Sequence, residues 1–336
     1  MRLQTLPNQW LMLSDVMKDD KIIEFFKKYN DSYVSGEELS REFKVSRTAI
    51  WKHIEKLREE GYDIIASPHL GYRLMSLPDR LTEVELKWQL DSSVIGNKIY
   101  AYRQLDSTND VAYRLAMSGE KEGAVVISEY QTKGRGRLGR KWISPKNKGA
   151  YFSLILRPDI LAKDVSTITA FVSLGVTKAI RDATGLPATI KWPNDIFIKR
   201  KKVSGILIES SAESDKVNFI VAGIGININT EKDMLPKEAT SLAIERKKEI
   251  LRVDFVKSVL KTLDIYYRIF RNGGISEIME EYKNFLGILD TRVQINYHNK
   301  LISGYAVDVD SDGALVLRLD TGLQVKILAG DVLMLR

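Results

Sequence analysis

The hydrophobic and polar positions of this chain change their spacing along its length. Two long stretches, residues 163–184 and 250–272, repeat apolar side chains at the spacing of one helix face, which predicts two amphipathic helices. Near the C-terminal end the spacing becomes strict alternation, over residues 293–297 and 315–319, with glycine turns between and after these runs. Alternation over such short runs predicts strands. The pattern therefore indicates a chain of α+β class that ends in a small β-domain.

The N-terminal part has the pattern of three short helices followed by a hairpin. Residues 21–26 predict the first helix, and Ser35, with a glutamate three residues later, begins a capping box for the second. Ser46 is a good N-cap for a third helix that ends before Gly61. Residues 62–75 then predict a two-stranded wing. This order is typical of a winged helix-turn-helix domain.

Charge within this N-terminal part is concentrated on the predicted third helix. Residues 18–75 carry eleven Lys and Arg against eleven Asp and Glu, whereas residues 44–58 carry five basic side chains against Glu55 alone. Contacts to DNA phosphates require such a local excess. A winged helix that binds another protein is the alternative. The candidate DNA-contacting residues are Ser46, Arg47, Thr48, Trp51, Lys52 and Arg73.

A loop that alternates glycine with basic residues follows the apolar run at residues 124–129. Its sequence, from Gln131 to Trp142, is QTKGRGRLGRKW. Glycine lets the backbone approach a ligand closely, and each arginine offers a fork of donors that matches phosphate and carboxylate oxygens. The loop therefore predicts an anion cradle, with a solvated basic loop as the alternative. A dinucleotide-binding GxGxxG motif is disfavoured, because that motif opens a helix and here Pro145 soon follows.

A second polar cluster interrupts the apolar stretch at residues 189–198. This stretch and residues 203–209 are rich in Ile and Val and are separated by a basic turn, which predicts a hairpin. Pro193 inside the first run predicts an edge or bulged strand, because proline cannot donate to a sheet. The polar side chains gathered here are Lys191, Asn194, Asp195 and, in the hairpin, Lys202. Such a cluster is unusual in a core strand and indicates a site.

Two further pieces carry weaker signals. Residues 221–229 place Gly223 and Gly225 in an apolar strand, where side chains would block something packed against the sheet. Residues 105–110 open a helical pattern with Ser107, and an ordinary N-cap is the alternative interpretation of that serine. Neither piece identifies a ligand by itself.

Taken together, the four pieces resemble the biotin protein ligases. That family has, in this order, a Ser-Thr-Asn helix start, a Gln before a GRGRxGR loop, a KWPND strand, a Lys in the next hairpin and a Gly-Ile-Asn strand, and all occur here. The resemblance covers about residues 80–336. The expected domains are a disordered extension at 1–17, a DNA-binding winged helix-turn-helix at 18–76, a mixed α/β catalytic domain at 81–285 and an SH3-like barrel at 286–336.

The resemblance also implies a reaction and its residues. Biotin and ATP would form biotinyl-5′-AMP and pyrophosphate, and a lysine of a biotin carboxyl carrier protein would then take the biotinyl group. The implied biotin contacts are Ser107, Thr108, Asn109, Gln131, Gly134, Arg135, Gly136, Arg137, Lys202 and Gly205, and the implied ATP contacts are Arg137, Arg140, Trp142, Lys191, Asn194, Lys202 and Asn227. Bifunctional members repress biotin genes, so operator DNA and an adenylate-dependent homodimer are further expectations.

The chemistry explains why these residue types are needed. A carboxylate and an α-phosphate about 4 Å apart repel by roughly 4 kcal/mol at an effective dielectric constant near 20. Four cations are expected to remove that cost, together with Mg²⁺ on the triphosphate near Asn194 and Asp195. They are Arg135, Arg137, Arg140 and Lys202, of which Arg137 and Lys202 are the candidate catalytic residues. In the transfer step an ordinary lysine needs about 4.6 kcal/mol to lose its proton at neutral pH. Asp195 is the candidate base.

Two other functions stay open from the sequence. A lipoate-type ligase would share the fold and the adenylate chemistry, and a biotin-sensing regulator without enzymatic activity would keep the pocket and the DNA domain. The chain has no cysteine, three histidines and a net charge of +7, which excludes disulfides and predicts no metal site built by the protein alone. No apolar run reaches the roughly 18 residues of a membrane helix. These features predict a cytoplasmic protein.

Overall fold

The computed structural model describes residues 19–29, 32–297, 300–328 and 330–334. The chain forms two compact units that divide between Arg80 and Leu81. The expected extension over residues 1–17 lies outside the described part of the chain. Among the described helices, none is both long enough and apolar enough to cross a membrane.

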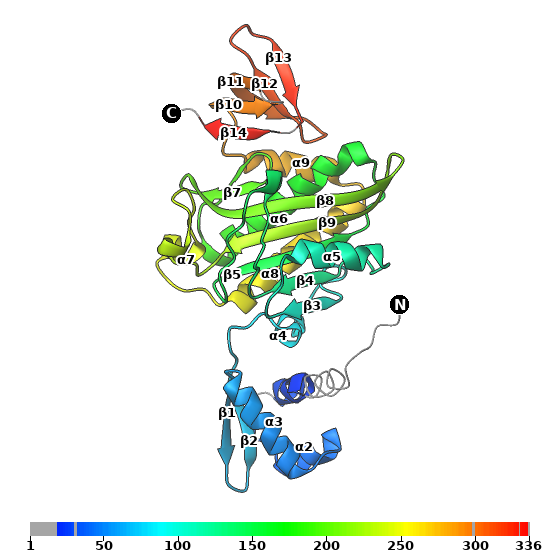
Figure 1. Cartoon of the computed structure of the whole chain (residues 1–336), viewed down its shortest axis with the longest axis vertical. Helices are drawn as coiled ribbons and strands as arrows, with labels where there is room; N and C mark the ends of the chain where they lie inside the picture. Colours follow the sequence, from blue (N-terminus) through cyan, green and yellow to red (C-terminus); the bar gives the residue numbers. More distant parts are fainter. Residues whose placement is uncertain (1–18, 30–31, 298–299, 329, 335–336) are drawn as a thin grey trace. The chain divides into compact units, whose positions relative to one another are not determined.

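The N-terminal unit is a winged helix-turn-helix, as the sequence predicts (Figure 1). Residues 19–28 are helical, α2 spans Gly36–Phe43 and α3 spans Arg47–Glu59. The hydroxyls of Ser35 and Ser46 accept hydrogen bonds from the amides three residues on and so cap α2 and α3. Strands β1 (Asp63–Ser67) and β2 (Gly71–Ser76) form the antiparallel wing. The buried core of this unit includes Ile22, Leu39, Ile50, Ile54 and Leu57.

A seven-stranded mixed sheet organises the second unit (Figure 1). The strand order is β3-β4-β5-β9-β8-β7-β6, and only the β3–β4 pair is parallel among these described strands. The strands are β3 (Ile99–Tyr102), β4 (Val125–Ser128), β5 (Gly149–Leu156), β6 (Thr189–Lys191), β7 (Asp195–Ile198), β8 (Lys201–Glu213) and β9 (Lys216–Asn227). All residues of β4 and β5 are buried, as expected where helices cover both faces of a sheet.

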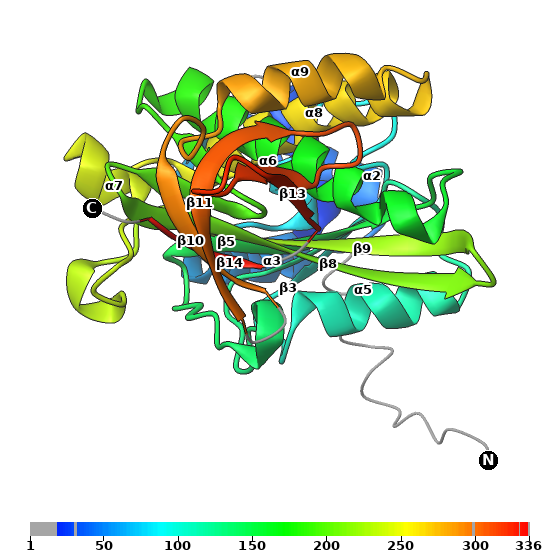
Figure 2. The same cartoon turned by 90° about the horizontal axis from the view of Figure 1, so that it is seen from above.

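Helices cover the two faces of this sheet unequally. Figure 2 shows α6, α8 and α9 on one side of the strands and α5 on the other. The helices are α4 (Glu83–Lys87), α5 (Thr108–Met117), α6 (Val165–Thr184), α7 (Leu242–Arg246), α8 (Arg252–Arg271) and α9 (Ile275–Asn284), with short 3₁₀ turns η1 (Arg137–Gly139), η2 (Ala162–Asp164) and η3 (Lys232–Met234). The two long helices predicted from apolar spacing are therefore confirmed as α6 and α8.

The capping box Thr82-Glu-Val-Glu85 predicts a helix through Leu90, and helix α4 is shorter than that. Thr82 caps it by accepting a hydrogen bond from the amide of Glu85, but the helix ends at Lys87 and does not continue through Leu90. Gln89 adopts a left-handed backbone with φ of 55°. A residue in that region cannot continue a right-handed helix.

The KWPND segment forms two strands and not the single strand that the sequence predicts. Lys191 ends β6, Asp195 begins β7, and these two residues pair across the antiparallel ladder. The turn between them contains a cis Trp192–Pro193 peptide bond. Proline has no amide hydrogen to donate, so the ladder stops there and the chain turns back. The predicted hairpin to the following strand is confirmed, because β7 pairs antiparallel with β8.

The C-terminal part is the small β-domain that alternation predicts. Its antiparallel strands are β10 (Arg292–Tyr297), β11 (Lys300–Val309), β12 (Leu315–Arg318), β13 (Gln324–Ile327) and β14 (Asp331–Met334), in the order β13-β12-β11-β10-β14. The indole nitrogen of Trp192 donates to the carbonyl of Gly313 at 3.0 Å. This bond ties the turn of the KWPND segment to the β-domain.

Candidate ligand pocket and recognition helix

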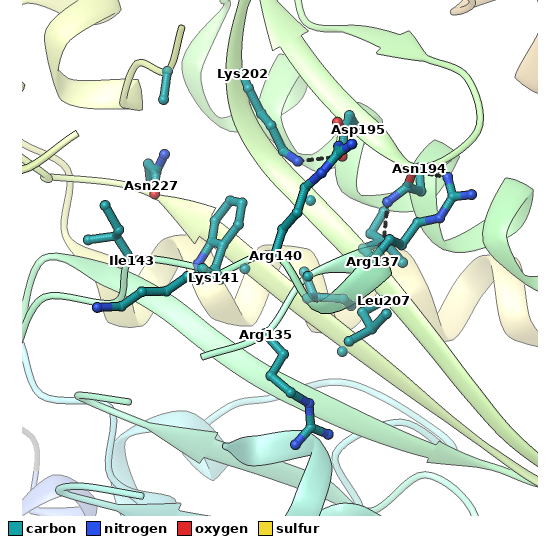
Figure 3. Close-up of a pocket in the computed structure, with 18 of the residues that line it drawn as sticks. Arg135, Arg137, Arg140, Lys141, Ile143, Asn194, Asp195, Lys202, Leu207 and Asn227 are labelled. Atoms are coloured by element: carbon teal, nitrogen blue, oxygen red, sulfur yellow. Dashed lines mark hydrogen bonds and ion pairs between the residues drawn. The ribbon is translucent and has the colours of Figure 1, made fainter. Parts of the chain in front are cut away.

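A cavity of about 280 Å³ lies where the start of α5, the loop over residues 130–148, and strands β7, β8 and β9 meet (Figure 3). We call it the main cavity, and residues 130–148 the ligand loop. Most of the side chains and glycines expected to bind biotin or ATP line it. They are Ser107, Thr108, Asn109, Gln131, Arg135, Gly136, Arg137, Arg140, Trp142, Asn194, Asp195, Lys202, Gly205 and Asn227.

Two of the expected residues do not line the main cavity. Gly134 lies inside the turn of the ligand loop, where an added Cβ would meet the carbonyl oxygen of Trp142 at 2.6 Å. Lys191 lines a neighbouring pocket beside the C-terminal β-domain, with its ammonium 5.2 Å from the ring centre of Phe197. Arg140 and Asp195 border both pockets.

The start of α5 is capped by the ligand loop and not by its own serine. Ser107 is the N-cap residue, but its side chain makes no capping hydrogen bond. Instead, Gln131 Oε1 accepts from the amide of Thr108 at 2.8 Å and from its hydroxyl at 3.1 Å. Gln131 Nε2 donates to Ser144 Oγ at 3.0 Å. The glutamine therefore fixes the helix start and the loop to each other at the wall of the cavity.

Asn109 is held by a buried polar network beside this helix start. Its Nδ2 donates to Glu209 Oε2 at 2.6 Å, and its Oδ1 accepts from Ser153 Oγ at 2.6 Å. Gly223 gives it room, because a Cβ at that position would lie 2.1 Å from Asn109 Oδ1. Buried polar groups with all partners present have a single orientation. This wall of the cavity is thus preformed.

Arg135 forms ion pairs with two carboxylates at the edge of the cavity. Its guanidinium lies 2.6 Å from Asp110 Oδ1 and 3.3 Å from Glu209 Oε1. Burial lowers the pKa of Arg135, but the hydrogen bonds and charges of Asp110 and Glu209 together outweigh burial, so the pKa is raised above its ordinary value. In Figure 3 this side chain points away from the other cations of the loop.

The cations at the opposite side of the cavity also have partners within the chain. Arg137 Nη1 donates to Asn194 Oδ1 at 2.9 Å, and Lys202 Nζ lies 2.6 Å from Asp195 Oδ1 (Figure 3). Both partners come from the KWPND segment, so its turn brings an amide and a carboxylate against the ligand loop. These contacts place two positive charges at one end of the cavity.

Trp142 occupies the floor of the cavity, on top of two sheet glycines. A Cβ at Gly225 would lie 2.5 Å from its ring and one at Gly205 would lie 3.1 Å away. The ammonium of Lys202 sits 5.4 Å from the ring centre. The glycines of β8 and β9 were expected to make room for something packed against the sheet, and in this structure that group is the chain's own indole.

Besides Asp195 Oδ1, which is paired with Lys202, two polar atoms at the cavity are buried and have no hydrogen-bond partner among the described residues. They are Nε1 of Trp142 and Oδ1 of Asn227, a donor and an acceptor. Asn227 is fixed through its other atom, since Nδ2 donates to the carbonyl of Thr240 at 3.1 Å. An unpaired buried polar group is costly, so both atoms favour a ligand that supplies hydrogen bonds.

Sequence reasoning did not identify several residues of the site. Asp110 and Glu209 hold Arg135, and the segment at residues 235–239 contributes Leu235, Pro236, Glu238 and Ala239 to the cavity wall. Glu209 is a charged residue directly after the apolar run at residues 206–208, and this signal was available in the sequence. The 235–239 segment lies in a loop without periodic pattern, and only the fold brings it to the cavity.

Helix α3 presents most of the expected DNA contacts, and we call it the recognition helix. Ser46, at its N-cap, and Arg47, Thr48, Trp51 and Lys52 are all exposed. Trp51 is 51% exposed, which is unusual for tryptophan in a free protein. Arg47 pairs with Glu37 at 2.7 Å, and Arg73 on the wing lies over the ring of Tyr33.

Three parts of the chain match described families. Residues 100–227 match the Biotin/lipoate A/B protein ligase family, residues 288–335 match the Biotin protein ligase C terminal domain, and residues 19–73 match an HTH domain. The helix-turn-helix match falls on the winged unit, and the ligase match contains the ligand loop and the KWPND segment.

Individual relatives extend the match over nearly the whole chain. The chain is 36% identical to the bifunctional ligase/repressor BirA of Bacillus subtilis, over 96% of this chain and 99% of that protein. It is 29% identical to the bifunctional ligase/repressor BirA of Escherichia coli, over 87% of this chain and 90% of that protein.

A solved structure agrees with the fold. The biotin protein ligase from Aquifex aeolicus, in complex with biotin and ATP, superposes with a TM-score of 0.61 at 30% identity and covers 71% of this chain and 99% of its own. From the identity to full-length relatives and from the order of its motifs and domains, the chain belongs to the biotin protein ligase family, in the branch of bifunctional ligase/repressors.

Proposed function

We propose that this chain is an ATP-dependent biotin protein ligase that also represses biotin genes. It forms biotinyl-5′-AMP and pyrophosphate from biotin and ATP, and it transfers biotin to a lysine of a biotin carboxyl carrier protein. The single observation that carries this proposal is the main cavity, in which the GRGRxGR loop, the KWPND turn and the two glycine strands converge. We assign DNA binding to residues 18–76, catalysis to 81–285 and a supporting role to the β-domain at 286–336.

Adenylation requires two anions to approach each other inside the cavity. The cost of roughly 4 kcal/mol for two such charges at about 4 Å falls when fixed cations lie beside both. Arg137 and Lys202 occupy one end of the cavity and are held by Asn194 and Asp195. Cations positioned before the reaction need no reorganisation during it. We assign the biotin carboxylate and the α-phosphate to this end.

Substrate binding at this end requires an exchange of partners. Each cation already has an acceptor within the chain, so a bound carboxylate or phosphate must compete with Asn194 for Arg137 and with Asp195 for Lys202. An anionic ligand forms charge-assisted hydrogen bonds, which are stronger than the neutral amide contact that Arg137 gives up. We expect the arginine to change partner more readily than the lysine.

The remaining assignments follow from the walls of the cavity. Ser107, Thr108 and Gln131 suit the ureido ring of biotin, because hydroxyl and amide groups can both donate and accept. Trp142 and Asn227 suit the nucleotide base, as an aromatic surface and a free acceptor.

Mg²⁺ on ATP is generally held by one or two carboxylates together with the phosphates. Asp195 is the carboxylate that would hold it, and the ion would supply further neutralisation of phosphate charge.

Transfer to the carrier needs an unprotonated lysine amine. That costs about 4.6 kcal/mol at neutral pH for an ordinary lysine, and Asp195 is our candidate to accept the proton. The carboxylate is engaged with Lys202 at 2.6 Å. A role as base therefore requires that ion pair to open after adenylation, once pyrophosphate has left and Lys202 has a phosphate to contact.

Repression requires the winged unit to be presented in pairs. Strand β8 continues to Glu213, whereas β7 pairs only with its first residues, up to Gly205. The amide of Ile206 still donates to the carbonyl of Asn194, and within the described residues Leu207 to Glu213 have a ladder partner only in β9. A strand with one unpaired edge is a template for another strand. We propose an adenylate-dependent homodimer, which places two recognition helices on neighbouring half-sites of operator DNA.

A labelling assay tests the ligase function. The purified chain is incubated with ATP, a carrier domain and either radiolabelled biotin or radiolabelled lipoate. We expect label on the carrier only with biotin. Labelling with lipoate would identify a lipoate-type ligase, and the absence of labelling with binding of biotin retained would identify a regulator without enzymatic activity.

A gel shift tests the repressor function separately. Promoters of the organism's biotin genes are titrated with the chain alone, with biotin and with biotinyl-5′-AMP, at one salt concentration. Only the adenylate can contact both Arg137 and Trp142, so we expect it to tighten operator binding the most, by about 5- to 150-fold, or 1 to 3 kcal/mol. Equal affinity in all three states would remove the corepressor role and leave the ligase function standing.

A further inference from the structure

A buried ion pair lies beneath the ligand loop and outside the main cavity. Arg252, the first residue of α8, is 1% exposed, and Glu129, the residue after β4, is 8% exposed. Arg252 Nη1 lies 2.5 Å from Glu129 Oε2, and Nη2 donates to Oε1 at 3.4 Å. Neither residue lines the main cavity.

The position of this pair is costly for the arginine alone. A cation at the first residue of a helix faces the positive end of the helix dipole, and its burial removes it from water. A buried charge without its partner is strongly destabilising. The carboxylate of Glu129 is therefore held in place by electrostatics, and whatever else it contacts is held with it.

Two further segments meet at this pair. Glu129 Oε1 accepts a hydrogen bond from the amide of Leu81 at 2.7 Å, and Arg252 Nη1 donates to the carbonyl of Gly149 at 3.3 Å. Glu129 and Gly149 are the residues that flank the ligand loop on its two sides. Leu81 is the first residue of the second unit and follows Arg80, the last residue of the DNA-binding unit.

A further bond closes the base of the ligand loop at the same place. The carbonyl of Glu129 accepts from the amide of Asn147 at 3.2 Å. Gln131, which caps α5 at the wall of the cavity, follows Glu129 by only two residues. Glu129 therefore connects Gln131 at the cavity wall to the amide of Leu81.

We propose that Glu129 and Arg252 are positioning residues that clamp both ends of the ligand loop to the connector, residues 77–84, which joins the DNA-binding unit to the second unit. This inference rests on the proposed function, because it identifies the route by which ligand binding regulates DNA binding. When a ligand orders the loop, the loop fixes the backbone of Glu129. The carboxylate of Glu129 then holds the Leu81 amide more firmly. By reciprocity, a connector fixed on DNA stabilises the ordered loop.

The clamp is tested first without any ligand, by hydrogen–deuterium exchange on the full chain. Glu129→Gln should speed exchange of both segments 77–84 and 130–148 by about tenfold or more. The matched control is Asp264→Asn, since Asp264 is a buried carboxylate that accepts from the amides of Ser93, Val94 and Ile95. In the control, faster exchange should be confined to residues 93–95. Unchanged exchange at either of the first two segments in Glu129→Gln would overturn the clamp.

A second variant covers the event that Glu129→Gln does not fold. Arg252→Lys keeps the buried positive charge but loses the fork that reaches both Glu129 and Gly149. We expect the same two segments to exchange faster, by a smaller factor than in Glu129→Gln. If Arg252→Lys folds, as judged by circular dichroism, and both segments keep wild-type exchange, the clamp is also excluded.

The coupling is tested by repeating the exchange with biotin and ATP. In the wild-type chain, exchange should slow in segment 130–148 and also in segment 77–84, and the Asp264→Asn control should behave alike. In Glu129→Gln or Arg252→Lys, the slowing should be lost or reduced at 77–84 but kept at 130–148. Slowing of the loop without slowing of 77–84 in the wild type would refute the coupling. No slowing of the loop at all would refute the proposed function, while the measurement without ligand still decides the clamp.

Discussion

The basic side chains of the recognition helix and those that line the main cavity have opposite surroundings. Arg47 on the helix is 70% exposed, and its partner Glu37 is 74% exposed. In the main cavity, Arg135 is 39% exposed and Lys202 is 30% exposed, with partners at 2.6 Å. An exposed pair contributes little and is screened by salt, whereas the partly buried pairs are held by the fold around them.

This difference in exposure fits the two kinds of phosphate that we propose as ligands of the two regions. In the proposed function, DNA phosphates replace counterions and water on the recognition helix, so affinity should depend strongly on salt. In the cavity, the ligand replaces acceptors of the chain itself, so binding should depend on the geometry of Asn194 and Asp195. Variants that affect one region alone are the way to test this separation.

The largest effect is expected from removing residues 1–76. Operator binding in gel shifts should be abolished, because the recognition helix and the wing are gone. Carrier biotinylation should remain measurable, since the described residues of the main cavity all lie beyond this segment. Loss of both activities would show that the two regions are not separable.

The next largest effect is expected at Lys202, one of the partly buried cations of the main cavity. Lys202→Ala should slow adenylation by about 100-fold, as expected when one fixed donor to a reacting anion is removed, and should raise the concentrations of biotin and ATP required. ATP–pyrophosphate exchange measures both. Lys201→Ala is the control, because Lys201 is the exposed neighbour on β8 and does not line the cavity. Near-normal adenylate synthesis in Lys202→Ala would remove it from the site.

A smaller effect is expected at the ligand loop itself. Arg137→Gly should still make adenylate but release it faster, by about tenfold, which corresponds to about 1.4 kcal/mol of lost contact. Stopped-flow measurement of adenylate dissociation gives the rate. Lys133→Gly changes a cation of the same loop that is 74% exposed and lies outside the cavity lining. It controls for the added backbone freedom of glycine, and equal dissociation rates in the two variants would contradict a specific role of Arg137.

The smallest effect is expected on the exposed recognition helix. Arg47→Ala should weaken operator binding about equally across related sequences and reduce the slope of log affinity against log salt by about 0.9. Adenylation should be intact. Lys28→Ala, an exposed cation on the first helix, is the matched control. If the salt slope is unchanged in Arg47→Ala, this arginine does not contact a phosphate.

Much of the fold and the identity of the site residues could be predicted from the sequence, because the signals involved are local. Ser35, Ser46 and Thr82 each cap a helix through an amide three residues away. Apolar spacing identified α6 and α8, and alternation identified strands of the C-terminal domain. The GRGRxGR and KWPND motifs pointed to residues most of which line one cavity. All of these depend on contacts within a few residues or on short patterns.

Other features were decided only by the tertiary structure. The division of KWPND into β6 and β7 depends on the pairing of Lys191 with Asp195 in the sheet. The indole of Trp142 lies on Gly205 and Gly225 only because β8 and β9 are neighbours. Glu129 and Arg252 are 123 residues apart in sequence and 2.5 Å apart in space. Such contacts carry no local pattern, because they form only when packing of the whole core brings distant segments together. For this reason the sequence identified the cations of the site but not which residues pair with them.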